Sequence, residues 1–513
     1  MMNHTDDNPF LAILFDHAGR KATHPALRHK GQVMTYGELA AAVQKTAGGL
    51  ARSGIGKGDR VLLFVPMSIQ LYVLLLAVWH RGATAVFLDA WADRKRLEHA
   101  ITLADCKGFI GIFKTHLFRL ISPALRSIPV KRFAGWMPSG EPSSVTPVKP
   151  EQTALLTFTT GSTGTPKAAD RTVGFLLAQH HALSHHLSPR KDEIDLTALP
   201  IFVLTNIASG ITSVIPDMDH RHPERVDPAV LLKELDHHRV TRACGSPVIF
   251  DRLARHCEQT GRRPETLRRI FLGGAPVFPD LAERLVRAFP HVEVEIVFGS
   301  TEAEPISRVN AATVAQSRIT SPDQGLPVGK PVEEIDCRIL EIQYGPIEVT
   351  SVEALDRITL PAGSVGEICV GGDHVLKAYF NNPEAVRENK IIAGESLWHR
   401  TGDAGYLDRN GELYLMGRVG SRFDREGRRY FVFPLESMLG DLPGVTLGTY
   451  LTHGDQLILV YEGTAEETAL LQQIRSGPLP EPDRILRMPI PRDPRHNSKI
   501  DYGILRLRIE TNG

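Results

Sequence analysis

A loop of small residues behind an apolar run constrains the fold of this chain more than any other feature. The run Gln152–Phe158 (QTALLTF) is apolar and of strand length, and the stretch from Thr159 to Gly164 contains only Gly, Ser and Thr. Lys167 follows, directly after a Pro. Backbone N–H groups, small hydroxyls and one ammonium can surround an anion without steric cost. The pattern predicts a loop at the end of a sheet strand, where α/β folds hold their ligands.

The same stretch has part of the spacing of a Walker A loop, Gly-x4-Gly-Lys-Ser/Thr. Gly161 and Lys167 have the required separation. Pro166, however, occupies the position of the second Gly, and Ala168 replaces the hydroxyl that would bind Mg²⁺. The sequence therefore argues against a P-loop kinase or ATPase.

The order of apolar runs predicts an α/β architecture, because short β-branched runs alternate with helical segments through most of the 513 residues. The run 61–79 is apolar enough to suggest a membrane span, but Pro66, Ser68 and Gln70 divide it. We expect a buried strand followed by a buried helix there. An Asn-Gly pair at 410–411 predicts a hairpin. We place a domain boundary just after that hairpin, which gives domains 1–417 and 418–513.

Composition excludes several classes of partner. Lys plus Arg and Asp plus Glu both number 59 and are interspersed, so nothing favours nucleic acid or an anionic membrane surface. The five cysteines are scattered without CxxC spacing, which argues against a disulfide frame or a zinc site. The first ten residues lack a basic region followed by an apolar core, so we expect no signal peptide. These features predict a soluble, cytoplasmic protein without a transmembrane segment.

Two motifs downstream of the loop contain residues suited to a nucleotide. In FLGGAPVFPD (271–280), the glycines remove side chains and let a flat ligand approach the backbone. In VFGSTEAEP (297–305), we expect a strand that ends at Phe298 and a turn that presents Thr301 and Glu302. A carboxylate such as Glu302 suits Mg²⁺, which takes one or two carboxylates plus phosphate oxygens.

Two later motifs add charged groups. In WHRTGDAGYLDRNGELYLMGR (398–418), Asp403 lies in an expected Arg-Thr-Gly-Asp turn, and Arg418 closes the block. A carboxylate can accept both hydroxyl protons of a diol, and a guanidinium fork suits an anion. In PRDPRHNSKIDYG (491–503), Lys499 supplies an ammonium close to the C-terminus.

Together the five motifs resemble the adenylate-forming superfamily, which includes acyl-CoA synthetases, adenylation domains of peptide synthetases and firefly-type luciferases. They occur in the family's order and cover the chain from about residue 150 to residue 503. The resemblance implies a large N-terminal AMP-binding and acyl-binding domain of mixed sheets flanked by helices. It also implies a small, mobile α+β C-terminal domain that rotates between half-reactions, with ATP and Mg²⁺ as cofactors.

The resemblance further implies a role for each matching residue. The phosphate loop corresponds to Thr159, Thr160, Gly161, Ser162, Thr163, Gly164 and Lys167. The adenine pocket corresponds to Gly273, Gly274, Ala275, Phe298, Gly299 and Ser300. Thr301 is implied to bind a phosphate, Glu302 to bind Mg²⁺, Asp403 to bind the ribose diol, and Arg418 to lie at the ribose and phosphate. Lys499 matches the catalytic lysine, although Ser498 stands where many members have Gly.

The branch of the family is suggested by a departure from the usual pattern. Acyl-CoA synthetases usually carry Pro-x-x-His after the phosphate loop, whereas Phe202 and Val203 stand here where that His is sought. The runs ITSVIPDMD, GSPVIFDRL and RHNSK are most similar to β-lactone synthetases of bacterial olefin biosynthesis. That similarity implies a 2-alkyl-3-hydroxy fatty acid as substrate, closure by its own hydroxyl, and partner enzymes of a lipid pathway.

Two other functions stay open. A fatty acyl-CoA ligase without the His would use the same residues and would take CoA as acceptor. A non-catalytic nucleotide- or acyl-binding protein is a third alternative, although intact Lys167, Glu302, Asp403 and Lys499 argue against it. Seven apolar residues are candidates for an acyl tunnel, with a plain core role as the alternative: Phe202, Val203, Leu204, Ile207, Val248, Ile249 and Phe250. The histidines at 180, 181, 185 and 186 favour a structural or solvated cluster over a metal site.

Overall fold

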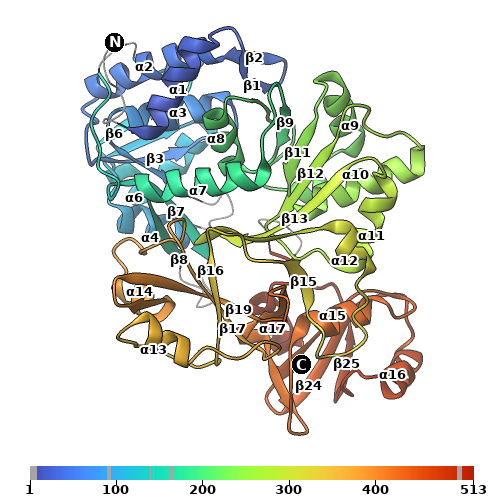
Figure 1. The fold of residues 1–513 in the computed structure, drawn as a ribbon. Coiled ribbons are helices and arrows are strands. Elements are labelled where there is room, and N and C mark those ends of the chain that lie inside the picture. The colour runs from blue at the N-terminus through green and yellow to red at the C-terminus, as the bar shows by residue number, and fades with distance from the viewer. Residues whose placement is uncertain are drawn as a thin grey trace.

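A computed structural model of the chain describes residues 8–88, 94–138, 140–141, 144–160, 166–493 and 499–512. The α/β class expected from the sequence is confirmed, because mixed sheets are flanked by helices (Figure 1). A larger N-terminal part carries three sheets, and a smaller C-terminal part follows it.

The first N-terminal sheet has eight strands. Its six inner strands run parallel, and an antiparallel strand lies at each edge. In spatial order the strands are β14 (Ala303–Asn310), β13 (Glu293–Ser300), β12 (Arg269–Gly273), β11 (Arg242–Gly245), β9 (Ile194–Thr197), β10 (Thr212–Val214), β1 (Pro25–His29) and β2 (Gln32–Thr35).

The second sheet has six strands, five of them parallel, and ends in an antiparallel hairpin. Its order is β6 (Val130–Phe133), β5 (Gly108–Gly111), β3 (Arg60–Phe64), β4 (Thr84–Phe87), β7 (Thr153–Thr160) and β8 (Pro166–Thr172). The small-residue loop therefore joins β7 to β8, at the end of a strand as expected.

Helices cover both sheets, and α7 (Val173–Leu187) packs against β8 of one sheet and β14 of the other (Figure 1). Thr172 caps α7 by accepting a hydrogen bond from the Phe175 N–H. The other N-terminal helices are α1 (Pro9–Arg20), α2 (Tyr36–Arg52), α3 (Ile69–His80), α4 (Arg94–Ala104), α5 (Phe113–Leu117), η2 (Phe118–Leu120), α6 (Pro123–Ser127), α8 (Pro200–Ser209), η3 (Pro223–Arg225), α9 (Pro228–His237), α10 (Pro247–Thr260), α11 (Pro279–Ala288) and α12 (Ala311–Gln316).

The apolar run 61–79 forms β3 and α3, so the expected strand followed by a helix is confirmed. The side chains of α3 are buried almost all round, because α1, α2 and the strands beside α3 enclose it. A helix that is apolar on every face belongs in such a position. Within the described residues, no helix is long and apolar enough to cross a membrane.

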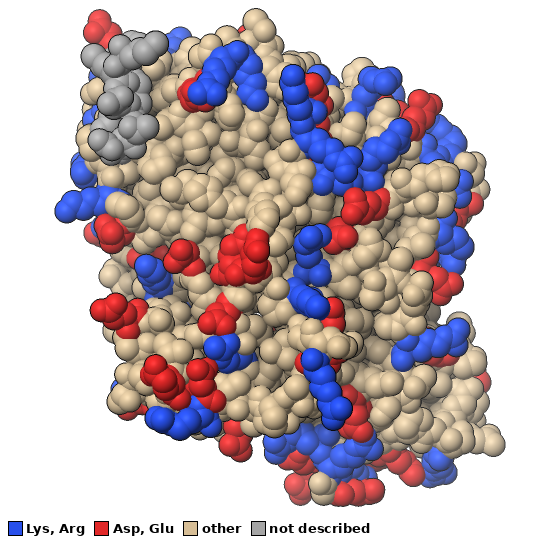
Figure 2. Space-filling model, viewed as in Figure 1, with Lys and Arg blue, Asp and Glu red and all other residues tan. Residues whose placement is uncertain are grey.

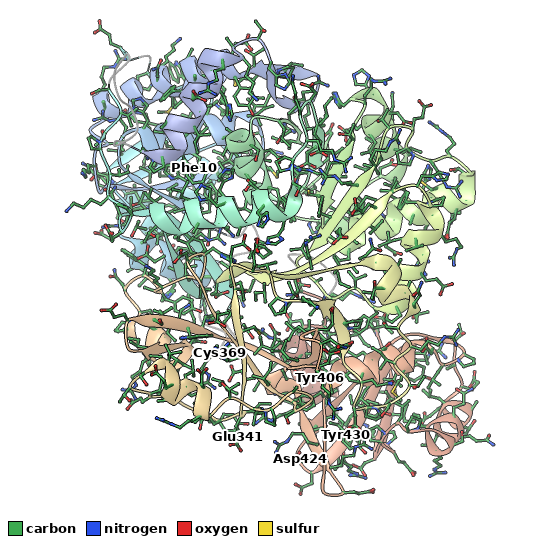
Figure 3. All side chains as sticks on the ribbon, in the orientation of Figure 1. Phe10, Glu341, Cys369, Tyr406, Asp424 and Tyr430 are labelled. Carbon is green, nitrogen blue, oxygen red and sulfur yellow. The ribbon has the colours of Figure 1, made fainter. Side chains whose placement is uncertain are left out.

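The third sheet is antiparallel and carries the predicted Asn-Gly hairpin between β19 and β20. It contains β15 (Leu326–Gly329), β20 (Leu413–Arg418), β19 (Ser396–Leu407), β17 (Gly366–Gly371) and β16 (Asp336–Leu340), and β18 (Lys390–Ala393) pairs with β19. Cys369 on β17 and Tyr406 on β19 mark this sheet in Figure 3. Its helices are α13 (Val352–Arg357) and α14 (Pro383–Asn389).

The C-terminal part follows β20 and contains a three-stranded sheet and a two-stranded hairpin. Its elements are η4 (Val419–Ser421), β21 (Phe423–Arg425), β22 (Arg428–Tyr430), α15 (Val432–Gly440), β23 (Val445–His453), β24 (Gln456–Gly463), α16 (Glu467–Ser476), β25 (Arg484–Arg487) and α17 (Tyr502–Asn512). Side chains of both charges are interspersed over the face shown in Figure 2, as the balanced composition predicts. All five cysteines are free and buried.

Candidate active site

The predicted motifs meet around one cavity of about 1360 Å³. Residues of all three N-terminal sheets and of the C-terminal part line it, including the predicted site residues Lys167, Gly274, Ala275, Phe298, Gly299, Ser300, Thr301, Glu302, Asp403, Arg418 and Lys499. Gly273 lies at the buried end of β12 and is not among the lining residues. Gly161, Ser162, Thr163 and Gly164 lie outside the described residues, as do the side chains of Thr159 and Thr160.

The motif VFGSTEAEP (297–305) forms the tight β13–β14 hairpin beside the cavity. The strand continues to Ser300, two residues beyond the expected end at Phe298, and only Thr301 and Glu302 form the turn. The reason is that Ser300 still pairs with Ala303 across the hairpin. Gly299 permits this close return, because a Cβ there would lie 2.9 Å from the Ala303 carbonyl oxygen.

The carboxylate of Glu302 faces polar groups from the part of the third sheet that runs from the end of β17 to β18. The Tyr379 hydroxyl donates a hydrogen bond of 3.0 Å to Glu302 Oε1, and the Leu376 N–H donates one of 2.7 Å to the Glu302 carbonyl. The Lys390 ammonium lies 5.6 Å from the centre of the Tyr379 ring. These contacts hold the β13–β14 turn against the segment between β17 and β18, which carries Tyr379.

The electrostatics around Glu302 favour its ionised form. Burial raises the pKa of the Glu302 carboxyl, but the charge on Lys390 and the hydrogen bond from Tyr379 act in the opposite direction, and the pKa lies below its ordinary value. Burial lowers the pKa of His399 to about 3, so at neutral pH this ring is uncharged. Lys390 and Tyr379 are then the groups that hold Glu302 ionised. A half-buried carboxylate that stays ionised and lines a cavity fits Mg²⁺.

Lys390 itself titrates near neutrality. Burial lowers the pKa of its ammonium to about 7, against the attraction of the Glu302 carboxylate, which raises it. Its ammonium also donates a hydrogen bond to the Leu376 carbonyl. Lys390 and His399 stand directly opposite each other on β18 and β19. A local sequence pattern does not reveal this pair, since the two residues stand on different strands and each has other polar residues beside it in the sequence.

Asp403 and Arg418 form an ion pair across β19 and β20, with Arg418 Nη1 3.0 Å from Asp403 Oδ1. Arg418 also donates a hydrogen bond of 3.1 Å to the Thr401 carbonyl. The expectation that Asp403 lies in a turn is wrong, because the strand β19 continues through it. Gly402 has a φ of +70°, which L side chains rarely adopt. The glycine makes β19 irregular at this point, but the chain does not reverse its direction.

A buried ion pair supports the Asp403 segment from behind. Arg400 Nη2 lies 2.6 Å from Glu367 Oε2, and both side chains are almost fully buried. Glu367 also accepts a hydrogen bond of 3.2 Å from the Gly402 N–H. The backbone next to Asp403 is therefore held by β17, and the sequence gives no pattern that predicts this support.

Lys499 reaches the cavity from the C-terminal part. The Lys499 N–H donates a hydrogen bond of 2.9 Å to Asp493 Oδ1, and the Asp493 N–H donates one of 2.8 Å to the Lys499 carbonyl. These two bonds close the loop whose residues 494–498 lie outside the described residues. Just after it, the Tyr502 hydroxyl donates a hydrogen bond to the buried carboxyl of Glu436, which also accepts one of 2.9 Å from Thr449.

The apolar wall of the cavity differs from the predicted tunnel. Phe202 and Leu204 line the cavity, and Tyr72, Leu75 and Phe87 line it as well. The other five candidates do not line the cavity and pack instead in or against the core of the first two N-terminal sheets, the alternative left open by the sequence: Val203, Ile207, Val248, Ile249 and Phe250. Helix α8 has apolar residues on several faces, and its sequence alone does not show which face meets the cavity.

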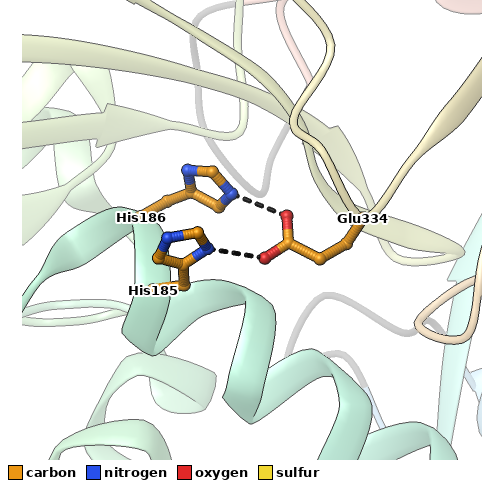
Figure 4. Close-up of side chains that lie close together, drawn as sticks. All are labelled: His185, His186 and Glu334. Carbon is orange, nitrogen blue, oxygen red and sulfur yellow. Dashed lines mark hydrogen bonds and ion pairs between the residues drawn. The ribbon is translucent and has the colours of Figure 1, made fainter.

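The histidines of α7 divide into an inner and an outer group. His180 is buried, whereas His185 and His186 lie in the last turn of the helix and meet Glu334 (Figure 4). The distance from His185 Nδ1 to Glu334 Oε1 is 2.8 Å and that from His186 Nε2 to Glu334 Oε2 is 2.7 Å. Their donor atoms lie within 4.8 Å of one another, close enough for a metal ion. Both imidazoles already hydrogen-bond to the Glu334 carboxylate. These contacts therefore connect the end of α7 to the segment before β16.

This fold, with a Gly/Ser/Thr hairpin loop, an acidic hairpin turn and a carboxylate–Arg pair around one cavity, corresponds to the adenylate-forming enzymes. The model of the family described as AMP-binding enzyme matches residues 14–380, and the chain belongs to that family. Its adenylate-forming ligase class, expected from the motifs, is thereby confirmed.

The relatives carry names of two kinds, a beta-lactone synthetase and coenzyme A synthases. The chain is 30% identical to an olefin beta-lactone synthetase of Stenotrophomonas maltophilia, over 94% of this chain and 92% of that protein. It is 29% identical to a feruloyl-CoA synthase of Amycolatopsis sp, over 82% and 80%. Among solved structures, the O-succinylbenzoate coenzyme A synthetase of Bacillus subtilis in complex with ATP and magnesium ion superposes with a TM-score of 0.79, at 22% identity, over 97% of this chain and 99% of that one.

Proposed function

We propose that this chain uses ATP and Mg²⁺ to adenylate a fatty acid with a 3-hydroxyl group, and that this hydroxyl then closes a β-lactone and releases AMP. The observation that carries the proposal is the single cavity, in which Glu302, the Asp403–Arg418 pair and Lys499 face an apolar wall. Polar groups at one end and apolar groups at the other suit a molecule that joins a nucleotide to an acyl chain.

Each polar group has a place in nucleotide binding. The adenine lies against Phe298 and the backbone of Gly274 and Ala275, and the Asp403 carboxylate accepts hydrogen bonds from both ribose hydroxyls. Arg418, already paired with Asp403, lies beside the ribose and the α-phosphate. Lys167 and the loop 159–164 surround the outer phosphates, and Thr301 donates a hydrogen bond to a phosphate oxygen.

In the first half-reaction, a carboxylate oxygen of the acid attacks the α-phosphorus. A P–O bond forms, the bond to pyrophosphate breaks, and the two electrons of that bond leave with pyrophosphate. The Lys499 ammonium lies between the carboxylate and the α-phosphate and offsets the negative charge that gathers there. Glu302 would hold Mg²⁺, which would neutralise phosphate charge.

In the second half-reaction, the 3-hydroxyl oxygen attacks the acyl carbon. The new C–O bond closes the four-membered ring, the bond to AMP breaks, and the hydroxyl proton passes to solvent. The nucleophile belongs to the bound molecule, so its effective concentration is high and no second substrate pocket is needed. The similarity to the olefin beta-lactone synthetase supports this acceptor. The domain 418–513 would rotate between the two steps, and partner enzymes of a lipid pathway would supply the acid.

A fatty acyl-CoA ligase is the second candidate, and the similarity to a feruloyl-CoA synthase favours it. In that case a thiol of CoA, in place of the internal hydroxyl, attacks the acyl carbon. The first half-reaction is the same for both candidates, so they differ only in the product.

The experiment that tests adenylation is pyrophosphate release with a panel of acids. The panel holds a 2-alkyl-3-hydroxy fatty acid, its 3-deoxy analogue and an aromatic acid, each with ATP and Mg²⁺. We expect repeated turnover with the hydroxy acid and a single burst of acyl-AMP with the deoxy analogue. Absence of pyrophosphate release with every acid would contradict adenylation and leave the non-catalytic binding protein.

A further inference from the structure

An unusual surface lies at the β6 edge of the second sheet. Within the described residues, seven of the fourteen large apolar side chains that are exposed lie between residues 113 and 136. They are Phe113, Leu117, Phe118, Leu120, Ile121, Phe133 and Trp136, with exposed fractions of 69, 50, 43, 74, 52, 38 and 82%. We name this surface the 113–136 face. Scattered exposed apolar residues are ordinary, but a cluster of this kind marks a contact surface.

The residues of the 113–136 face form one continuous surface. Helix α5, the turn η2 and helix α6 follow one another and pack together, and β6 is the outermost strand of its sheet. The ring of His116, on α5, lies 4.0 Å from the ring of Phe133, on β6. Trp136 lies next to the end of β6, since its backbone N–H donates a hydrogen bond of 3.0 Å to the Phe133 carbonyl.

The charge of this segment differs from that of the whole chain. From Cys106 to Gly140 there are six Lys or Arg residues and no Asp or Glu, although the complete chain has equal numbers of both charges. Lys107 pairs with Asp59. Arg119, Arg126 and Arg132 donate hydrogen bonds to neutral groups, and within the described part of the chain none of them has a carboxylate partner.

We propose that the 113–136 face binds the surface of an anionic lipid bilayer. Exposed Phe, Leu and Trp side chains enter the headgroup boundary, where aromatic residues with a polar edge are favoured. Lysine and arginine next to them attract anionic lipid headgroups. A bilayer is favoured over a protein partner because the segment combines exposed aromatic and aliphatic side chains with six cations, the chemistry of a headgroup boundary. The inference goes beyond the proposed function, and it does not depend on it.

The test is co-sedimentation of the full-length protein with vesicles. One set contains phosphatidylcholine and phosphatidylglycerol at three to one, and the other contains phosphatidylcholine alone. We expect binding to the anionic vesicles, a shift of Trp emission to shorter wavelength that the Trp136→Phe variant lacks, and weakening at high salt. Equal recovery with both sets of vesicles, or no binding to either, would overturn the proposal.

Variants separate the apolar from the charged contribution. The pairs Leu120→Gln with Trp136→Gln and Lys114→Gln with Arg126→Gln are each expected to weaken vesicle binding by about tenfold or more. The matched control is Val230→Gln with Lys233→Gln, which removes one exposed apolar and one exposed cationic residue of α9. The control should bind as the parent does. An equal loss in the control would contradict a specific face.

Self-association through the same face is the alternative that the measurement also decides. A concentration-dependent dimer that the Leu120→Gln and Trp136→Gln pair abolishes, together with no vesicle binding, would replace the bilayer by a second copy. Vesicle binding needs neither ATP nor acid, so its failure is distinct from a failure of adenylation. Pyrophosphate release with a short, water-soluble acid should be unchanged in all these variants.

Discussion

The hydroxyl of Tyr379 donates a hydrogen bond of 3.0 Å to the carboxylate of Glu302. Glu302 lies in the β13–β14 turn and Tyr379 in the segment between β17 and β18, so this bond links the first sheet to a connecting segment of the third sheet. It also helps to keep the pKa of Glu302 below its ordinary value in spite of burial. The orientation and the charge of the proposed Mg²⁺ ligand thus depend on one phenol.

Tyr379→Phe is expected to raise the Mg²⁺ concentration needed for half-maximal pyrophosphate release by about tenfold, the scale for losing a hydrogen bond to a charged group. The ring remains, so its contacts with Lys167 and Lys390 survive. Titration of Mg²⁺ at saturating ATP measures the effect, with Tyr430→Phe, which does not line the cavity, as the control. An unchanged Mg²⁺ requirement would remove Tyr379 from this role.

Asp403→Ala is expected to weaken ATP binding by roughly 2 kcal/mol or more, because a charged acceptor for two ribose hydroxyls is lost. Arg418 would at the same time lose its carboxylate partner. Calorimetric titration with ATP and with 2′,3′-dideoxy-ATP provides the measurement, and the variant should discriminate poorly between the two. If the parent already binds dideoxy-ATP as tightly as ATP, the ribose role of Asp403 is wrong.

Lys499→Ala is expected to lower the rate of acyl-AMP formation by on the order of a hundredfold or more, the scale for losing one preorganised charge. ATP binding should largely survive, since the Asp403–Arg418 pair and the other nucleotide contacts remain in the variant. Single-turnover formation of acyl-AMP and ATP titration separate the two effects. Lys233→Ala, an exposed lysine of α9, is the matched control. Pyrophosphate release at the parental rate would exclude Lys499 from the chemistry.

Glu436 is expected to make stability fall as pH rises. Burial raises the pKa of its carboxyl from 4.5 to about 7. Between these two pH values the folded state keeps a proton that the unfolded state has lost, so the free energy of unfolding decreases by about 3 kcal/mol as pH rises through this window.

The variant Glu436→Gln cannot titrate, and its amide oxygen can still accept hydrogen bonds from Thr449 and Tyr502. Urea unfolding midpoints at pH 5 and pH 7 should therefore differ less in the variant than in the parent. The same pH dependence in both proteins would contradict the raised pKa.

The sequence predicts those parts of the site that rest on local patterns. Gly, Ser, Thr and Pro mark the β7–β8 and β13–β14 turns, and Asn-Gly marks the β19–β20 hairpin, so these elements follow from turn chemistry. The Arg-Thr-Gly-Asp pattern predicts a turn at Asp403, whereas in the structure the strand continues and accommodates the positive φ of Gly402.

Other parts of the site depend on contacts between distant segments. Tyr379 and Lys390 lie near Glu302 because the third sheet packs against the first, and no spacing in the sequence predicts that proximity. Phe202 lines the cavity while its neighbour Val203 packs in the core, since burial on α8 depends on the helix's orientation. The 113–136 face could likewise not be predicted from the sequence. The overall charge is balanced, and which apolar side chains are exposed depends on how the edge of the second sheet folds.

The measurement that tests the account most directly is mass spectrometry of the product formed from ATP, Mg²⁺ and a 2-alkyl-3-hydroxy fatty acid, with and without CoA. If the internal hydroxyl is the acceptor, a product with the mass of the acid minus one water forms without CoA, in step with AMP release, and added CoA changes neither. Turnover that occurs only with CoA and yields a thioester would contradict lactone closure and identify an acyl-CoA ligase.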